Sequence, residues 1–290
     1  MNIKNVSFIG LGVMGYPMAG HLQKNGYNVS VYNRTKTKSQ KWVSEFGGHM
    51  YTTPAEASKE AEIVFICVGR DKDIIEVMEG KHGILSSSKK GSIIVDHTTA
   101  SAEIARVYSK KLKSINLGFL DAPISGGQAG AENGILSIMI GGEKENFEKV
   151  KPVLESYGKA IELIGPSGSG QIAKMINQIC IAGLVQGLSE AMAFGKKANV
   201  DMEKVLSVIS KGAAQSWQME NRYRTMLDGK FDYGFAVDWM RKDLSICFNE
   251  AKKNGSSLPI TKIVDKYYSE IQKNGGNRLD TSSLMKLVDK

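Results

Sequence analysis

The first half of the chain alternates short apolar runs with segments whose apolar residues recur at helical spacing. The apolar runs, most of them rich in β-branched residues, cover residues 6–10, 28–32, 62–68, 92–96, 118–121, 136–141 and 160–163. The helical segments cover residues 14–25, 35–46, 71–79 and 101–113. Strands and helices that alternate at this spacing form βαβ units, so the pattern predicts a parallel sheet of the α/β class.

The pattern changes after a glycine-rich stretch at residues 164–170. From Gln171 onward the apolar positions follow long helical periods, and almost no strand signal remains. A length of 290 residues suits two domains. We therefore predict one domain over residues 1–165 and an all-α domain over residues 166–290.

The stretch that comes nearest to a membrane span covers residues 171–195. Polar and charged residues interrupt it at Lys174, Asn177, Gln178, Gln186 and Glu190. A core helix explains this composition better, and we expect no membrane partner.

Three glycines follow the first predicted strand, in the string SFIGLGVMGYPMAGHL. Gly10, Gly12 and Gly15 satisfy the spacing G-x-G-x-x-G, which alone is a weak signal because glycines occur in many turns. Here they lie between a strand pattern and a helical one, where the backbone can approach a pyrophosphate and the helix N-terminus points at it. This context favours a dinucleotide-binding turn over a purely structural bend.

The end of the second predicted strand bears on which dinucleotide is bound. NAD-preferring sites usually place Asp or Glu there, to bind the ribose 2′-hydroxyl. In this chain Asn33 takes that place and Arg34 follows, so a guanidinium is present and a repelling carboxylate is absent. With Thr35 and Lys38 nearby, the pattern favours NADP(H) over NAD(H), which remains an option. The alternative is that Arg34 is a surface charge that stacks on the adenine and leaves the selectivity loose.

Candidate catalytic residues lie in the string GQIAKMINQI, at the start of the all-α domain. Lys174, Asn177 and Gln178 are at positions i, i+3 and i+4, so they share one face of an otherwise apolar helix. Burial lowers the pKa of a lysine from about 10.4 towards neutrality, which suits a general acid/base. The alternative is a lysine that reaches solvent from the start of a buried helix.

Two shorter stretches add candidates. Ser125, Gly126 and Gly127 end the string LDAPISGG, and their unhindered backbone N–H groups suit a carboxylate. Lys242 and Asp243 are adjacent in the string MRKDL. Each stretch alone is a weak signal, because most Ser-Gly-Gly turns are only turns and most Lys-Asp pairs lie on solvated faces.

In order along the chain stand FIGLGVMGYPMAGHL, DHTTAS, DAPISGGQAGAENG, GSGQIAKMINQ and WMRKDL. Together these motifs resemble the β-hydroxyacid dehydrogenases, which include 3-hydroxyisobutyrate, tartronate semialdehyde and succinic semialdehyde reductases, and the resemblance covers essentially the whole chain. It implies a Rossmann-type, doubly wound, mostly parallel sheet joined by a long helix to an all-α C-terminal domain. It also implies a homodimer or homotetramer.

By position, the resemblance implies a role for each candidate. Lys174 would be the general acid/base, Thr99 would contact the cofactor near the nicotinamide, and Lys242 would close over the cofactor. The predicted catalytic residues are Lys174 and Asn177. The predicted substrate contacts are Ser125, Gly126, Gly127, Lys174, Asn177 and Gln178. The predicted cofactor contacts are Gly10, Leu11, Gly12, Val13, Met14, Gly15, Asn33, Arg34, Thr35, Val68, Thr99, Phe235 and Lys242.

The chain departs from the family pattern in two places. Gln178 stands where many members have a second Asn, which we expect to tune substrate contacts. Ala102 replaces a frequent Pro, a change that we expect to affect only a helix start. Imine-reducing relatives typically lack the lysine found here at Lys174, so its presence argues against that chemistry.

The net charge of +8 raises the question of an anionic partner. Lys and Arg are scattered and no nucleic-acid motif accompanies them, so we expect a small carboxylate-bearing substrate and no nucleic acid. The four histidines show no ligand spacing, and we predict no metal site. His97, beside the predicted cofactor loop, is expected to be structural.

The three cysteines, Cys67, Cys180 and Cys247, are far apart and set in apolar runs. This predicts reduced, buried thiols in a cytoplasmic protein, and no secretory signal is visible at the N-terminus.

These observations predict an NADP(H)-preferring oxidoreductase that interconverts a small 3-hydroxy acid and its semialdehyde. Two alternatives remain at this point. One is a non-catalytic dinucleotide-binding sensor or scaffold. The other is a decarboxylating dehydrogenase of a phosphorylated sugar acid, which normally has a longer α domain.

Overall fold

The computed structural model describes residues 3–289. The chain divides into two compact units, Met1–Lys174 (unit 1) and Met175–Lys290 (unit 2). The division falls inside helix α8 (Ser169–Lys197), whereas the sequence put the domain boundary just before that helix.

Within the described residues, unit 1 is built on one nine-stranded sheet. The strands are β1 (Asn5–Ile9), β2 (Asn28–Tyr32), β3 (His49–Met50), β4 (Ile63–Ile66), β5 (Ile93–Asp96), β6 (Gly118–Asp121), β7 (Ile124–Ser125), β8 (Leu136–Gly142) and β9 (Gly158–Gly165). Their order is β3-β2-β1-β4-β5-β6-β8-β7, and β9 pairs with β8. The first six strands are parallel to one another, while β8 runs antiparallel to β6 and β7. The predicted mostly parallel sheet is confirmed.

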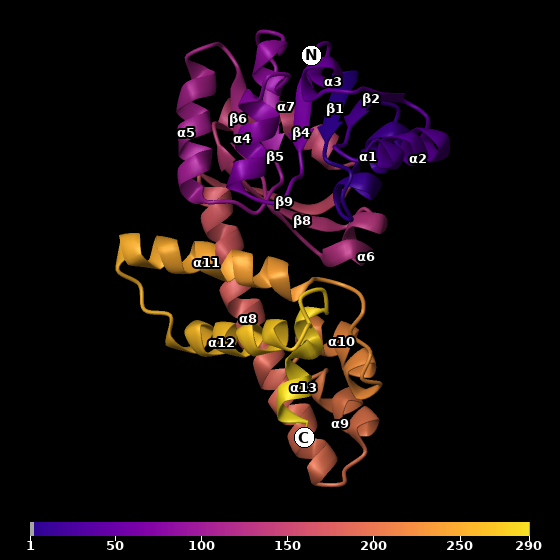
Figure 1. Cartoon of the computed structure of the whole chain (residues 1–290), viewed down its shortest axis with the longest axis vertical. Helices are drawn as coiled ribbons and strands as arrows, with labels where there is room; N and C mark the ends of the chain where they lie inside the picture. The colour runs from indigo at the N-terminus through magenta and orange to yellow at the C-terminus, as the bar shows by residue number, and fades with distance from the viewer. Residues whose placement is uncertain (1–2, 290) are drawn as a thin grey trace. The chain divides into compact units, whose positions relative to one another are not determined.

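Helices cover both faces of this sheet (Figure 1). One face carries α1 (Gly15–Lys24), α2 (Lys36–Phe46), α6 (Gly127–Glu132) and α7 (Lys144–Leu154). The other carries α3 (Pro54–Ser58), α4 (Asp71–Glu79), η1 (Ile84–Ser86) and α5 (Ala102–Lys113). Alternate residues of the central strands supply the two cores: Phe8 and Phe65 belong to the first cluster, and Ile9 and Ile66 to the second. This alternation is the doubly wound arrangement that the resemblance implied.

The parallel strands direct the site residues to one edge of the sheet. Because β1, β4, β5 and β6 are parallel, the segments that follow them leave the sheet at the same edge. Ser101 caps α5, since its Oγ accepts a hydrogen bond of 3.1 Å from the N–H of Ile104. Ala102 is the first residue of that helix, so its replacement of proline is confined to the helix start.

The described part of unit 2 is helical, as predicted. It contains the rest of α8, α9 (Met202–Ile209), α10 (Trp217–Leu227), α11 (Val237–Asn254), α12 (Pro259–Lys273), η2 (Thr281–Leu284) and α13 (Met285–Val288). One core cluster joins Ala182 and Val185 of α8 to α11 and α12. A second joins Leu188 and Met192 of α8 to α9 and α10.

By length and composition, α8 is the one helix in residues 3–289 that could cross a membrane. Core helices of soluble proteins meet the same criterion. One side of α8 carries core residues of unit 2, as in a core helix, and the absence of a membrane partner stays a prediction.

The prediction of three buried thiols is wrong for two of them. Cys247 is buried, but Cys67 is half-buried and Cys180 is exposed. Cys180 lies in an apolar run on the long helix α8, and the sequence does not say which side of this helix lies against the core.

Candidate active site

The glycine loop after β1 is shaped by close backbone contacts. Gly10 has a φ of +103°, and a Cβ on it would lie 2.3 Å from the carbonyl oxygen of Cys67. A Cβ on Gly15 would lie 2.0 Å from the carbonyl oxygen of Gly10. Only glycine fits at either position. A Cβ on Gly12, in contrast, would meet no atom within 4 Å.

The open side of this loop fits a dinucleotide. The first turn of α1 carries no acidic residue, and its N-cap, Met14, makes no side-chain capping bond. The N–H groups at that helix start therefore face no competing carboxylate, and Gly12 leaves room for a pyrophosphate to approach the backbone. Val13, beside it, is exposed.

Asn33 braces the loop from the end of β2. Its Oδ1 accepts a hydrogen bond of 3.0 Å from the N–H of Leu11, and its Nδ2 donates one of 3.0 Å to the carbonyl oxygen of Thr35. Arg34, next to it, is exposed, and the first turn of α2 contains no acidic residue. The end of β2 therefore presents a guanidinium with no adjacent carboxylate.

The loop that contains Thr99 is tied to β4 and to α8. The N–H of Val68 donates a hydrogen bond of 3.1 Å to Thr98 Oγ1. From α8, Gln171 Nε2 donates one of 2.7 Å to the carbonyl oxygen of Thr98, and Gln171 Oε1 accepts one of 3.0 Å from the N–H of Ala100. Gln171 thus bonds the backbone on both sides of Thr99. No pattern in the sequence points to Gln171.

Asp121, at the end of β6, fixes the start of α8. Its two carboxylate oxygens accept hydrogen bonds from the N–H groups of Gly168 (2.7 Å) and Gln171 (3.0 Å). Burial raises the pKa of Asp121, and these hydrogen bonds oppose the shift. A Cβ on Gly170 would lie 2.5 Å from the carbonyl oxygen of Met139, so glycine allows the helix to begin this close to the sheet. A carboxylate at a helix N-terminus also interacts favourably with the helix dipole.

Lys174 lies one helical turn beyond Gln171. Residues three apart share a helix face, so the two side chains are neighbours on α8. Lys174 is 7% exposed. The bonds of Asp121 and Gln171 therefore hold the first turn of α8, just before Lys174, at the sheet edge where the Thr99 loop emerges.

Ser125 and the two glycines after it form a sharp turn between β7 and α6. Gly126 and Gly127 have φ angles of +135° and +63°, which glycine adopts without strain. A Cβ on Gly127 would meet nothing within 4 Å. The backbone is therefore open at Gly127, which suits the approach of a small anion there.

Within unit 2, four predicted or noted residues form one hydrogen-bonded chain. Asn177 Nδ2 donates to Gln178 Oε1 (2.8 Å), and Gln178 Nε2 donates to Asp243 Oδ2 (2.6 Å). The Lys242 ammonium lies 2.7 Å from Asp243 Oδ1 and 5.9 Å from the centre of the Trp239 ring. The sequence had named Asp243 only as the neighbour of Lys242.

Phe235 is placed by backbone contacts at the start of α11. Its N–H donates a hydrogen bond of 2.8 Å to Asp280 Oδ2, and its half-buried ring packs against the cluster that contains Val237. Its predicted cofactor contact stays a prediction.

His97 is fully engaged in the core of unit 1. Its Nδ1 lies 2.6 Å from the carbonyl oxygen of Ala122, and its Nε2 lies 2.9 Å from the hydroxyl of Tyr157. Burial lowers the pKa of His97 to about 4. These contacts support a structural role.

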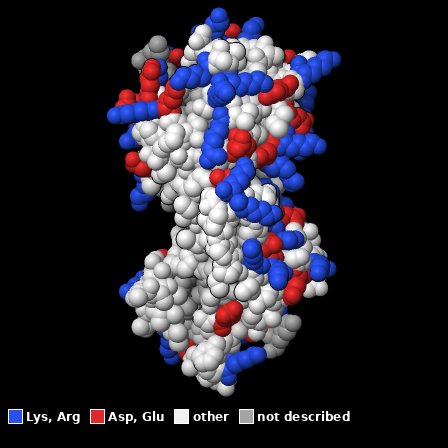
Figure 2. All heavy atoms as spheres, turned by 90° about the vertical axis from the view of Figure 1, so that its left-hand side faces the viewer, with Lys and Arg blue, Asp and Glu red and all other residues white. Residues whose placement is uncertain are grey.

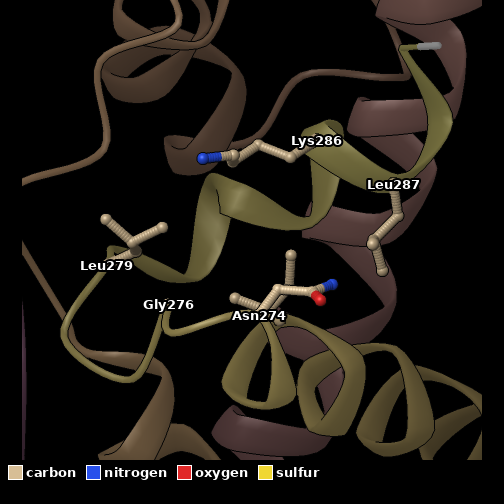
Figure 3. A pocket seen from close by; sticks show the side chains of 6 residues that line it. Asn274, Gly276, Leu279, Lys286 and Leu287 are labelled. Atoms are coloured by element: carbon tan, nitrogen blue, oxygen red, sulfur yellow. The ribbon is translucent and has the colours of Figure 1, made fainter.

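A hollow of about 160 Å³ lies in unit 2, at the end of α12 (Figure 3). It is lined by Ile271, Asn274, Gly276, Leu279, Lys286 and Leu287, none of which is a predicted site residue. Among residues 3–289, no group of three or more His, Cys, Asp or Glu side chains could hold a metal ion.

Charges of both signs alternate on the upper face in Figure 2, where Lys and Arg side chains lie among Asp and Glu. Two lysines of α5 are paired in this way: Lys111 lies 2.9 Å from Glu79, and Lys113 lies 2.6 Å from Glu143. Both lysines are therefore engaged with carboxylates on this exposed face.

Two family profiles together match nearly the whole chain. Residues 5–165 match the family described as the NAD binding domain of 6-phosphogluconate dehydrogenase. Residues 168–288 match the one described as "NAD-binding of NADP-dependent 3-hydroxyisobutyrate dehydrogenase".

Individual relatives are similar along their full length. An uncharacterised oxidoreductase of Shewanella frigidimarina is 57% identical over 285 residues, which are 98% of each chain. The 2-hydroxy-3-oxopropionate reductase of Escherichia coli is 34% identical, over 98% of this chain and 97% of that one. The structure of 3-hydroxyisobutyrate dehydrogenase from Salmonella typhimurium matches with a TM-score of 0.88 at 26% identity, over 98% of this chain and 99% of that one.

Proposed function

The chain belongs to the β-hydroxyacid dehydrogenase family, and on that premise we propose that it prefers NADP(H) and interconverts a small 3-hydroxy acid and its semialdehyde. The coarser activity follows from the family: the protein is an NAD(P)-dependent β-hydroxyacid dehydrogenase that uses a nicotinamide dinucleotide. The proposal concerns the preferred cofactor, the substrate and the residues that act on them.

The observation that carries the proposal is the anchoring of Lys174. Gln171 bonds the backbone on both sides of Thr99, and Lys174 follows it by one turn on the same face of α8. A buried amine held beside the loop expected to contact the nicotinamide suits a proton donor in hydride transfer.

The reaction divides between cofactor and protein. When bound, the nicotinamide exchanges a hydride with the carbinol carbon of the substrate. In reduction, the Lys174 ammonium donates a proton to the carbonyl oxygen as negative charge develops there. In oxidation, the neutral amine of Lys174 takes the proton from the hydroxyl group. Atoms and charge balance in both directions.

The substrate is held by its carboxylate in this proposal. The turn of Ser125, Gly126 and Gly127, whose backbone is open at Gly127, binds the anion, and the Ser125 hydroxyl adds a donor. Asn177 orients the reacting group and Gln178 tunes the contact, since both follow Lys174 on the same helix.

The cofactor is held by the glycine loop and selected by Arg34. The guanidinium of Arg34 binds the 2′-phosphate of NADP(H). Asn33 keeps the loop in place, Thr99 contacts the nicotinamide end and Lys242 closes over the dinucleotide. The further contacts proposed from the resemblance are Leu11, Val13, Met14, Thr35, Val68 and Phe235.

We propose a homodimer or homotetramer in the cytoplasm. The family resemblance supports the assembly, and so does the exposure of large apolar side chains on α8, where Ile176 is 58% and Phe194 is 76% exposed. Light scattering of the purified protein tests this, and a monomeric mass would contradict it.

The experiment for the proposed function is a matrix of initial rates. NADPH and NADH are each assayed with glyoxylate, 2-hydroxy-3-oxopropionate, methylmalonate semialdehyde and succinic semialdehyde. The expected result is turnover of 2-hydroxy-3-oxopropionate or methylmalonate semialdehyde, whose products are 3-hydroxy acids, faster with NADPH than with NADH. The E. coli relative, named a 2-hydroxy-3-oxopropionate reductase, gives that compound the first place in the panel. Tight NADPH binding without turnover of any panel member would favour a non-catalytic dinucleotide-binding protein.

A further inference from the structure

His21 of α1 contacts the last turn of α6. Its side-chain Nε2 lies 3.0 Å from the carbonyl oxygen of Ala131 and 3.0 Å from that of Glu132. Carbonyl oxygens only accept hydrogen bonds, so Nε2 carries the proton and donates to both. These carbonyl groups lie in the last turn of α6, and that of Ala131 also accepts a hydrogen bond of 3.3 Å from the N–H of Gly134. One side chain therefore joins α1 to the end of α6.

The imidazole also packs closely against the turn that ends α6. Gly134 has a φ of +66°, and a Cβ on it would lie 3.2 Å from Cε1 of His21. Ala131 is fully buried in the same core cluster as Leu22, the residue after His21. Hydrogen bonds and packing thus fix the end of α6 against α1.

The two joined helices begin at the two proposed binding turns. α1 starts at Gly15, where the glycine loop meets the dinucleotide. α6 starts at Gly127, directly after the turn proposed to bind the substrate carboxylate. α6 has only six residues and no side-chain N-cap, so its own start gives the turn little support.

We infer that His21 is a positioning residue that sets the carboxylate turn relative to the dinucleotide loop. The inference rests on the function proposed above. Hydride transfer requires the reacting atoms to be about 3–3.5 Å apart, and a displacement of about 1 Å costs on the order of 100-fold in rate. A contact that fixes α6 against α1 acts on that separation without touching substrate or cofactor.

The test compares acids with aldehydes that lack the carboxylate. Each panel acid that the wild-type enzyme reduces is paired with the aldehyde in which methyl replaces the carboxylate, such as 2-hydroxypropanal for 2-hydroxy-3-oxopropionate. In His21→Ala we expect kcat/KM for the acid to fall roughly 10-fold, with a loss in kcat because the bound acid is displaced from the nicotinamide, and to change less than about twofold for the aldehyde. The Kd of NADPH is expected to stay within about twofold of the wild-type value.

Two further variants separate positioning from general loss of structure. His21→Gln restores an N–H donor, which His21→Ala lacks, on a side chain long enough to reach the two carbonyl oxygens. We expect this variant to recover kcat/KM for the acid to within about threefold of wild type. His49→Ala removes an exposed histidine from β3 of the same unit and should leave kcat/KM unchanged for both the acid and the aldehyde. If His21→Ala does not fold, His21→Asn replaces it, because its shorter amide stops before the two carbonyl oxygens.

Equal losses for acid and aldehyde, an unchanged kcat/KM for the acid, or no recovery in His21→Gln would each overturn the inference. Ser125→Ala distinguishes this failure from failure of the proposed function. If Ser125→Ala lowers kcat/KM for the acid and His21→Ala does not, only the role of His21 is wrong. If neither variant affects the acid, the carboxylate turn itself is wrong.

Discussion

Gln178 and Asp243 are joined by a hydrogen bond of 2.6 Å, from the amide Nε2 to Oδ2. The other oxygen of the same carboxylate lies 2.7 Å from the Lys242 ammonium, and Asp243 is 2% exposed. A buried carboxylate is stable only with such partners. Asp243 therefore fixes Lys242, proposed to cover the cofactor, and Gln178, proposed to contact the substrate.

Asp243→Asn is expected to lower the free energy of unfolding by about 1–3 kcal/mol, because the Lys242 ammonium loses its ion-pair partner in a mostly buried place. The asparagine can still accept the hydrogen bond from Gln178. Urea unfolding measures the change, and Asp232→Asn, which makes the same replacement at an exposed position, is the control. A change no larger than in that control would contradict the buried pair.

Asp96 and His97 are adjacent, buried and opposite in their effect on pH-dependent stability. Burial raises the pKa of Asp96 to about 7 and lowers the pKa of His97 to about 4. Between pH of about 4 and 7 the folded protein keeps the Asp96 proton and the unfolded chain does not, so this contribution to stability falls as pH rises. Between about 4 and 6.5 the unfolded chain binds a proton at His97 and the folded protein does not, so that contribution rises.

Asp96→Asn removes the contribution of Asp96 to stability, which falls as pH rises, and leaves that of His97, which rises with pH. Its amide oxygen can still accept from the N–H of Thr98, which bonds Asp96 Oδ1 at 2.9 Å. Relative to wild type, the free energy of unfolding of the variant should rise by about 1 kcal/mol per pH unit between about pH 4.5 and 6.5. Urea titrations at several pH values measure this difference. A difference that does not vary with pH would mean that Asp96 is ionised throughout.

Arg34→Ala is expected to weaken NADPH binding by about 10-fold or more, because a charge-assisted contact with the 2′-phosphate is lost. NADH has no 2′-phosphate, so its Kd should change less than about twofold. Fluorescence titration of both cofactors gives the two values, with NADH as the internal control. Equal losses of affinity for NADPH and NADH would mean that Arg34 contacts the adenine, which both cofactors share, and would contradict its role in selectivity.

The sequence predicted the sheet well where strands are fully buried. The runs at β1, β4, β5 and β6 are mostly buried and largely apolar, which is typical of a parallel sheet covered on both faces, whereas β2 alternates buried and more exposed residues. The segments missed were β3, β7, α3, α6 and α7. β3 and β7 have two residues each and α6 has six, too short for any periodicity to appear.

The residues that hold the site in place were not found from the sequence. Gln171, Asp121 and His21 act through backbone groups 25 or more residues away, and such contacts leave no local pattern. Asn33 was noted only because it stands where NAD-preferring sites have Asp or Glu. Its side-chain amide hydrogen-bonds the backbone of Leu11 and Thr35, which the sequence did not indicate. The candidate catalytic residues were found because a lysine and an amide pair inside an apolar helix depart from the pattern around them.

The central claim is that Lys174 donates the proton during hydride transfer. Single-turnover reduction of the preferred semialdehyde, followed by the loss of NADPH absorbance, measures that step for wild type and Lys174→Ala, with the exposed Lys72→Ala of α4 as the control. We predict that Lys174→Ala lowers the rate by about 10²–10⁴-fold while the Kd of NADPH stays within a few-fold. An unchanged rate in Lys174→Ala would contradict the account, because the proton would then come from another group.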